Sequence, residues 1–152
     1  MTEFTRKEDG TFEVVVKVLG VDRPDRNGLC WNPEAMAKAI EKFNERVRTG
    51  RAIGELGQPA RRAGESAEDY RYRCSIVDMD NTCCLITDAK IEDNKLIAAM
   101  KPAGRWKGSV EQMLEDQVPL TLGIRAFCDV RDGKIHNVRD IVTFDVISPP
   151  TD

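Results

Sequence analysis

The chain has 152 residues and a formal net charge of −3, with 23 basic and 26 acidic residues spread along it. This length suits a single domain, residues 1 to 152, which buries roughly two thirds of its unfolded surface. The charge balance offers no basic surface for nucleic acid or an anionic membrane, so we expect neither as a partner. Its apolar runs are shorter than the roughly 20 residues of a membrane helix, and the polar N-terminus does not resemble a signal peptide. We therefore expect a soluble, cytoplasmic protein.

The cysteine pattern argues against a metal or redox site. The five cysteines are an odd number, and none is separated from another by the C-x-x-C spacing. Such a pattern is typical of reduced thiols that pack as small apolar side chains. The acidic residues also lack the ligand spacing of a calcium loop. The sequence thus predicts no metal and no cofactor.

The first third of the chain predicts a strand and a helix. The β-branched segment "TFEVVVKVLGV" alternates in polarity, which predicts a strand over residues 11 to 20. Asn32 followed by Pro33 is a helix-start signal, and Gly50 is a stop signal, so we expect a helix over residues 33 to 48. Its apolar stripe consists of Met36, Ile40, Phe43 and Val47.

Residues 60 to 73, "ARRAGESAEDYRYR", carry many charges and almost no aliphatic side chains. Such a segment cannot bury enough apolar surface to join a core. The sequence therefore predicts a mobile surface loop here.

The middle of the chain predicts a hairpin and a second, shorter helix. Strands over residues 83 to 91 and 95 to 101 flank a short polar turn. Ser109 with Gln112 three residues later matches a capping box, which predicts a helix over residues 109 to 117.

The last third predicts a second hairpin, "LTLGIRAFCDV" and "KIHNVRDIVTFDVI", around a turn at Asp132 and Gly133. A regular ladder from this turn would place Arg125 opposite Asp140 as a cross-strand ion pair. The full order of elements predicts an α+β fold, with a mostly antiparallel β-sheet or small β-barrel flanked by two helices.

The stretch "RAIGELGQP" holds the first candidate site residue. Glu55 lies between Gly54 and Gly57, and two interpretations are open. Either Glu55 orients a catalytic or binding group, or it accepts hydrogen bonds from backbone amides of a tight turn that the glycines allow. The residues favour the second interpretation.

Five stretches together resemble the prohead core protein proteases of tailed bacteriophages, serine proteases that cleave scaffold and capsid proteins during head maturation. They are "RNGLCWNPEAMAKAIEKF", "GRAIGELGQP", "NTCCLITDAKIEDNKL", "KPAGRWKGSVEQMLEDQVPLTLGIRA" and "FDVISPP". The second, which is similar to the family pattern "GRA-x-GELxHP", is the most specific, and the others count because their order and spacing agree. The resemblance implies a prohead-protease-like fold for most of the chain.

The family's reacting groups are substituted at the matching positions. Its histidine before proline falls on Gln58, and the serine and histidine of its "SH" fall on Cys83 and Cys84. A protease of this kind needs a hydroxyl nucleophile and an imidazole to take its proton. An amide cannot act as a general base near neutral pH.

The family segment "LGVSSRG" falls on "LGIRA" and also lacks a nucleophile. If Arg125 matches the family arginine, Gly123 and Ile124 stand at the two serines. If the register shifts, Arg125 and Ala126 stand there instead. Arg125 then has two interpretations, a cross-strand ion pair or a group that binds a peptide carbonyl.

These substitutions favour a phage capsid-assembly or maturation protein that is catalytically degenerate and binds a capsid, scaffold or other protein partner. One alternative is an active maturation protease with a diverged site, built on a Cys84 thiolate whose pKa basic neighbours lower. A further alternative is reuse of the fold as a virion decoration protein or an inhibitor of a host defence. The expected location is the host cytoplasm, in association with the prohead or virion if the protein acts in assembly. The oligomeric state stays open.

Overall fold

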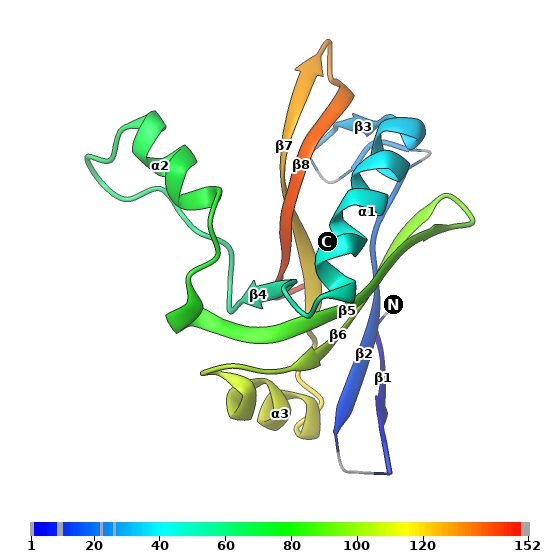
Figure 1. The fold of residues 1–152 in the computed structure, drawn as a ribbon, viewed down its shortest axis with the longest axis vertical. Helices are drawn as coiled ribbons and strands as arrows, with labels where there is room; N and C mark the ends of the chain where they lie inside the picture. The colour runs from blue at the N-terminus through cyan, green and yellow to red at the C-terminus, as the bar shows by residue number, and fades with distance from the viewer. Residues whose placement is uncertain (1, 9–10, 22, 26, 150–152) are drawn as a thin grey trace.

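The computed structural model describes residues 2–8, 11–21, 23–25 and 27–149, and Pro150 of "FDVISPP" lies outside them. Within these residues the strands form two sheets, in the orders β1-β2-β6-β5-β4 and β3-β8-β7 (Figure 1). The strands are β1 (Thr2–Arg6), β2 (Phe12–Gly20), β3 (Cys30–Trp31), β4 (Ile53–Glu55), β5 (Thr82–Glu92), β6 (Lys95–Pro102), β7 (Thr121–Arg131) and β8 (Lys134–Ile147). All neighbouring strands are antiparallel except β3 and β8, so the predicted α+β fold is confirmed.

The helices are α1 (Pro33–Arg48), α2 (Ala67–Cys74) and α3 (Lys107–Glu115), and a 3-10 turn, η1, spans Met79–Asn81. The described residues therefore contain one helix more than the two that the sequence predicts. None of the helices in this part of the chain is both long and apolar enough to cross a membrane.

The predicted helix over residues 33 to 48 is confirmed as α1, which packs against β8 and β5. The Asn32 side chain accepts hydrogen bonds from the backbone amides of the first turn, and Pro33 opens the helix. Phe43 on its buried face meets Phe144 of β8 edge to face, with ring centroids 5.3 Å apart. This contact fastens α1 over the junction of the two sheets.

The predicted strand over residues 11 to 20 is confirmed as β2, and the first predicted hairpin as β5 and β6. The β5–β6 turn places Asp93 and Asn94 in left-handed conformations, with φ angles of 51° and 60°. This pair of positive φ angles is the geometry of a two-residue hairpin turn.

The third helix begins at Lys107 rather than at residue 109. The backbone N–H of Trp106 donates to the Thr82 carbonyl at 3.0 Å, which fixes the start of α3 against β5. Ser109 therefore lies inside the helix, and the predicted capping box with Gln112 is wrong.

The second predicted hairpin is confirmed as β7 and β8, but its register differs from the prediction. Asp132 and Gly133 form the turn, with φ angles of 54° and 74°. Three register shifts follow, and each inserts an extra residue into β8, which has 14 residues against 11 in β7. The extra residues are His136, Arg139 and Val142. Arg125 consequently lies opposite Thr143, and the predicted pair with Asp140 is wrong.

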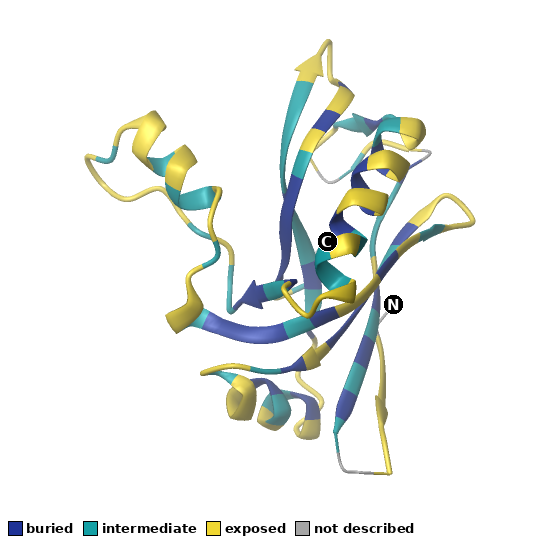
Figure 2. Ribbon diagram, viewed as in Figure 1, coloured by how far each residue is buried: buried dark blue, intermediate teal, exposed yellow. Residues whose placement is uncertain are grey.

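The predicted loop over residues 60 to 73 contains α2, so its irregular structure was wrongly predicted, although its place on the surface is confirmed. The Ser66 side chain caps the helix by accepting the Asp69 N–H at 3.0 Å, and Glu65 pairs with Arg73 at 2.7 Å. None of the described α2 side chains is buried (Figure 2), and α2 stands away from both sheets (Figure 1). Capping and charge therefore support a helix that has no apolar stripe.

Candidate functional site

The motif "GRAIGELGQP" forms β4 and joins the two sheets. A Cβ atom at Gly54 would overlap the Phe144 carbonyl oxygen and lie 2.7 Å from the Cys84 sulfur, so only glycine lets β4 pass between β5 and β8. Leu56, the first residue after β4, forms a parallel bridge to Val146 of β8. The strand thus fixes the motif residues that follow it against β8.

A buried guanidinium lies beside this junction. Arg125 donates from Nε and Nη2 to the two carboxylate oxygens of Asp145, at 3.1 and 2.9 Å, and from Nη2 to Glu55 at 2.8 Å. Its Nη1 donates to the carbonyls of Cys74 and Ile76 at 3.4 and 3.1 Å. These five contacts engage the five N–H groups of an arginine, which leaves none for a peptide carbonyl. All N–H groups of Arg125 are therefore used within the protein, which argues against the interpretation that Arg125 binds a peptide carbonyl.

Glu55 serves the same network and is 5% exposed. Besides Arg125, its carboxylate accepts the backbone N–H of Asp78 at 3.1 Å and the side chain of Asn81 at 3.2 Å. Its own N–H donates to Asp145 at 3.0 Å. Glu55 thus accepts a backbone amide, as one interpretation expects, but the amide belongs to the segment that leads into η1 and not to the turn of Glu55 itself.

The network holds two carboxylates against one guanidinium. Burial raises the pKa of Asp145 to about 6, while the Arg125 charge and the Glu55 N–H oppose that rise and the Glu55 charge adds to it. Asp145 is still ionised at neutral pH, where both of its oxygens accept hydrogen bonds. The network is therefore a structural clamp between β4, β7 and β8.

The structure brings together two positions at which the motif comparison places reacting groups. Gln58 Nε2 donates to the Ile124 carbonyl at 3.1 Å. A Cβ atom at Gly123 would lie 3.1 Å from this Nε2 and 3.3 Å from the Gln58 Cδ. In the register that matches Arg125 to the family arginine, the position of the family histidine thus lies beside the position of one family serine, and an amide and a glycine supply neither a general base nor a nucleophile.

The other two matched positions, Cys83 and Cys84, are fully buried in β5. The pKa of Cys84 is raised well above its ordinary value, first by a hydrogen bond with Cys83, then by burial and by the charges of Cys83 and Asp145. A buried, protonated thiol is a poor nucleophile. Cys84 contacts Gly54 in the interior, whereas Gln58 is exposed.

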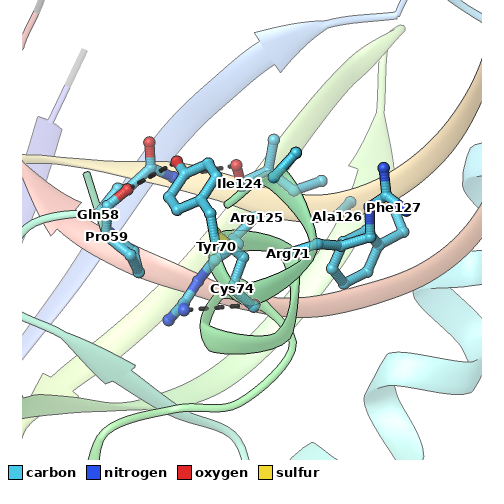
Figure 3. Close-up of a pocket in the computed structure, with 10 residues that line it drawn as sticks. Gln58, Pro59, Tyr70, Arg71, Cys74, Ile124, Arg125, Ala126 and Phe127 are labelled. Atoms are coloured by element: carbon cyan, nitrogen blue, oxygen red, sulfur yellow. Dashed lines mark hydrogen bonds between the residues drawn. The ribbon is translucent and has the colours of Figure 1, made fainter. Parts of the chain in front are cut away.

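A pocket of about 420 Å³ opens beside Gln58, between α2 and β7 (Figure 3). We call it the α2–β7 pocket. Its lining consists of Gln58, Pro59, Ala67, Tyr70, Arg71, Cys74, Ile124, Arg125, Ala126 and Phe127. The Tyr70 hydroxyl donates to the Pro59 carbonyl at 3.0 Å, which fastens α2 across the pocket. Among the described strands, β7 is last in its sheet, and the Ile124 carbonyl on its outer edge is bound by Gln58.

Sequence reasoning missed two parts of this site. Asp145 is an acid within the apolar run "DIVTFDVI", and that break in the pattern was the available signal. The wall that α2 contributes was missed because the segment has no apolar stripe, although Ser66 and Asp69 have capping spacing. Among the described residues, no group of three or more His, Cys, Asp or Glu side chains is placed to hold a metal.

Comparison with known proteins identifies a family and a shared fold. The sequence model of the Peptidase S80 family matches residues 2–151. Among solved structures, the capsid assembly protease gp21 of bacteriophage T4 superposes with a TM-score of 0.72. It is 16% identical, and the match covers 98% of this chain and 95% of that one. The search of curated proteins gives no match. At this identity the structural likeness shows a shared fold.

Proposed function

Because the chain belongs to the Peptidase S80 family, we propose that it is a phage capsid-assembly protein that has lost the protease reaction and acts by binding a protein partner. The partner class follows from the similar fold of a capsid assembly protease: a capsid or scaffold protein. The family name and the fold support this proposal, and the chemistry of the site favours binding over cleavage.

The observation that carries the proposal is the contact between Gln58 and Gly123. The two positions meet as a base and a nucleophile would, with 3.1 Å between the Gln58 Nε2 and a Cβ atom placed on Gly123. An amide nitrogen has no basic lone pair near neutral pH, and glycine has no side chain to attack a peptide. This pair supports the proposal, because neither group can take part in peptide cleavage.

Neither Tyr70 nor His136 restores the reaction. The pKa of Tyr70 is raised, first by a hydrogen bond with Cys74 and then by burial, so its hydroxyl stays neutral. The single histidine, His136, is exposed near the β7–β8 turn, whereas Gly123 lies toward the other end of that hairpin. Tyr70 carries no imidazole, and the imidazole of His136 lies far along the hairpin from Gly123.

The outer edge of β7 is the surface that we assign to the partner. All three register shifts insert residues into β8, so β7 itself runs without a bulge. A regular edge strand can take up an extended segment as one more strand, with main-chain hydrogen bonds supplying affinity at the edge groups that Gln58 does not occupy. The α2–β7 pocket then receives a side chain of that segment.

The experiment mixes the purified protein with the capsid and scaffold proteins of the same phage, and measures both association and cleavage. The matched edge variant is Ala126→Pro. N–H groups alternate along a strand, and the outward carbonyl of Ile124 implies that the Ala126 N–H also faces outward. Proline there removes an edge donor without removing a bond to β8.

We expect the native protein to form a complex, the Ala126→Pro variant to lose it while keeping its melting temperature within a few degrees, and no new fragments in either mixture. Sequence-specific cleavage that disappears on substitution of one residue would overturn the degenerate assignment. A complex that Ala126→Pro leaves intact would overturn the assignment of the edge.

A further inference from the structure

Gln58 has a second amide atom that the fold does not use. Its Nε2 donates to the Ile124 carbonyl, but its Oε1 accepts no hydrogen bond from the residues that the structure describes. We infer that Gln58 is a partner-binding residue: its amide is anchored on the β7 edge and presents Oε1 to a backbone N–H of the partner strand. This inference rests on the proposed function and names the group that accepts a hydrogen bond from the partner's main chain.

The backbone around Gln58 is held on both sides. The Gly57 N–H donates to the Val146 carbonyl at 2.8 Å, and Gly57 has a φ angle of 83° that favours glycine. On the other side, the Pro59 carbonyl accepts the Tyr70 hydroxyl at 3.0 Å. A side chain on a segment fixed in this way loses little additional freedom when it binds.

Gly123 makes the position of the amide possible. A Cβ atom at residue 123 would lie 3.1 Å from the Gln58 Nε2, which is closer than such contacts ordinarily allow. The same Cβ atom would lie 2.8 Å from Ile147 Cδ1, so a side chain at 123 would displace the Ile147 side chain and crowd the amide away from the Ile124 carbonyl. Gln58 and Gly123 form one unit, which we call the amide clasp.

The exposed position of Gln58 fits this role. Gln58 is exposed and lines the α2–β7 pocket, beside the outer edge of β7 (Figure 3). An amide donates with its nitrogen and accepts with its oxygen, as a peptide group of a strand does. The clasp thus favours an extended segment with a free backbone N–H at the residue that faces Gln58, and disfavours proline there.

A measurement without a partner tests whether the clasp exists. In the native protein we expect the side-chain amide protons of Gln58 to exchange with water more slowly than those of Gln117, an exposed glutamine outside the pocket. Gly123→Ala should return the Gln58 protons to the exchange rate of Gln117. Equal rates for the two glutamines in the native protein would overturn the clasp.

Binding tests the second half of the inference, with synthetic peptides that tile the capsid and scaffold proteins of the same phage. Gln58→Glu keeps the shape of the side chain but turns a carboxylate oxygen toward the Ile124 carbonyl, so we expect about tenfold weaker peptide binding. Gln117→Glu is the matched control for charge and should leave affinity unchanged.

The outcomes separate the two proposals. If peptides bind the native protein and Gln58→Glu equally well, the role of Gln58 is wrong and the proposed function stands. If no peptide and no intact capsid or scaffold protein binds the native protein, the proposed function fails and the partner-binding role of Gln58 fails with it. An N-methyl group at the peptide position that faces Gln58 should weaken binding to the native protein and have a smaller effect in Gln58→Glu.

Discussion

Arg125 and Gly123, two positions on β7, differ sharply in the groups that surround them. At Arg125 a buried guanidinium meets Asp145 and Glu55 in a network that engages all of its donors. At Gly123 there is no side chain, and the exposed Gln58 covers the space. The comparison teaches that Arg125 meets a complete set of hydrogen-bond acceptors, whereas the exposed Gln58 beside Gly123 keeps a polar atom available to a partner. The groups that stabilise the fold and the group that we assign to binding therefore lie at positions two residues apart along β7.

The largest expected effect comes from removal of the guanidinium. Arg125→Met leaves Glu55 and Asp145 as buried carboxylates without a cation, so we expect a loss of about 3–5 kcal/mol in the free energy of unfolding, measured with urea. Arg139→Met is the control, because Arg139 pairs with Asp129 on the surface and should cost less than about 1 kcal/mol. Equal losses for the two variants would contradict the account of the network.

A change of pH tests the same network more gently. The folded pKa of Asp145 is about 6, above its ordinary value of 3.8, so the folded protein binds this proton more tightly than the unfolded chain. The protonated Asp145 carboxyl therefore contributes to the free energy of unfolding in full below about pH 4. This contribution, on the order of 3 kcal/mol, is lost as the pH rises through 6.

The free energy of unfolding of the native protein, minus that of Asp145→Asn, should thus fall between pH 4 and pH 7. The subtraction removes the contributions of the other carboxylates, which act in both proteins. A difference that rises over this range would show that the pKa of Asp145 is lowered in the folded protein.

The close passage of β4 offers a test of the joint between the sheets. Gly54→Ala places a methyl group against the Phe144 carbonyl and the Cys84 sulfur, so the strands must separate, at a cost of about 2 kcal/mol. Gly108→Ala is the matched control, because a Cβ atom there meets nothing within 4 Å and lies in α3. Alanine at 108 should stabilise the helix by about 0.5–1 kcal/mol. Melting temperatures of the two variants on opposite sides of the native value would bear out both expectations.

The smallest expected effect concerns α2. Tyr70→Phe removes the hydrogen bond to the Pro59 carbonyl, so backbone amides of α2 should exchange with deuterium about fivefold faster while global stability stays nearly unchanged. Tyr72→Phe removes a hydroxyl from a side chain that is 68% exposed, and should change neither the exchange rate of the α2 amides nor the global stability. If exchange in α2 responds equally to both substitutions, Tyr70 does not fasten the helix.

Local signals predicted the parts of the fold that local physics decides. Asn32 and Pro33 marked the start of α1 because a side-chain cap and a fixed φ act within one turn. Asp132 and Gly133 marked the β7–β8 turn because its positive φ angles favour such residues. The motif comparison also anticipated that Gln58 and the strand of Gly123 belong to one site.

The remaining parts depend on packing that no local signal records. The shifts in β8 are set by how the hairpin coils against α1 and β4, and they moved Arg125 from the expected Asp140 to Asp145. The helix α2 forms through Ser66 and the Glu65–Arg73 pair, which an apolar stripe could not reveal. The burial of Cys84 follows from the passage of β4, which depends on Gly54.

Native mass spectrometry of this protein mixed with the capsid and scaffold proteins of the same phage tests the central claim most directly, because one spectrum reports both association and cleavage. The account predicts a complex whose mass equals the sum of its intact components, even after prolonged incubation. Free fragments of the partner that appear with the native protein, and are absent when this chain is omitted or heat-denatured, would contradict it.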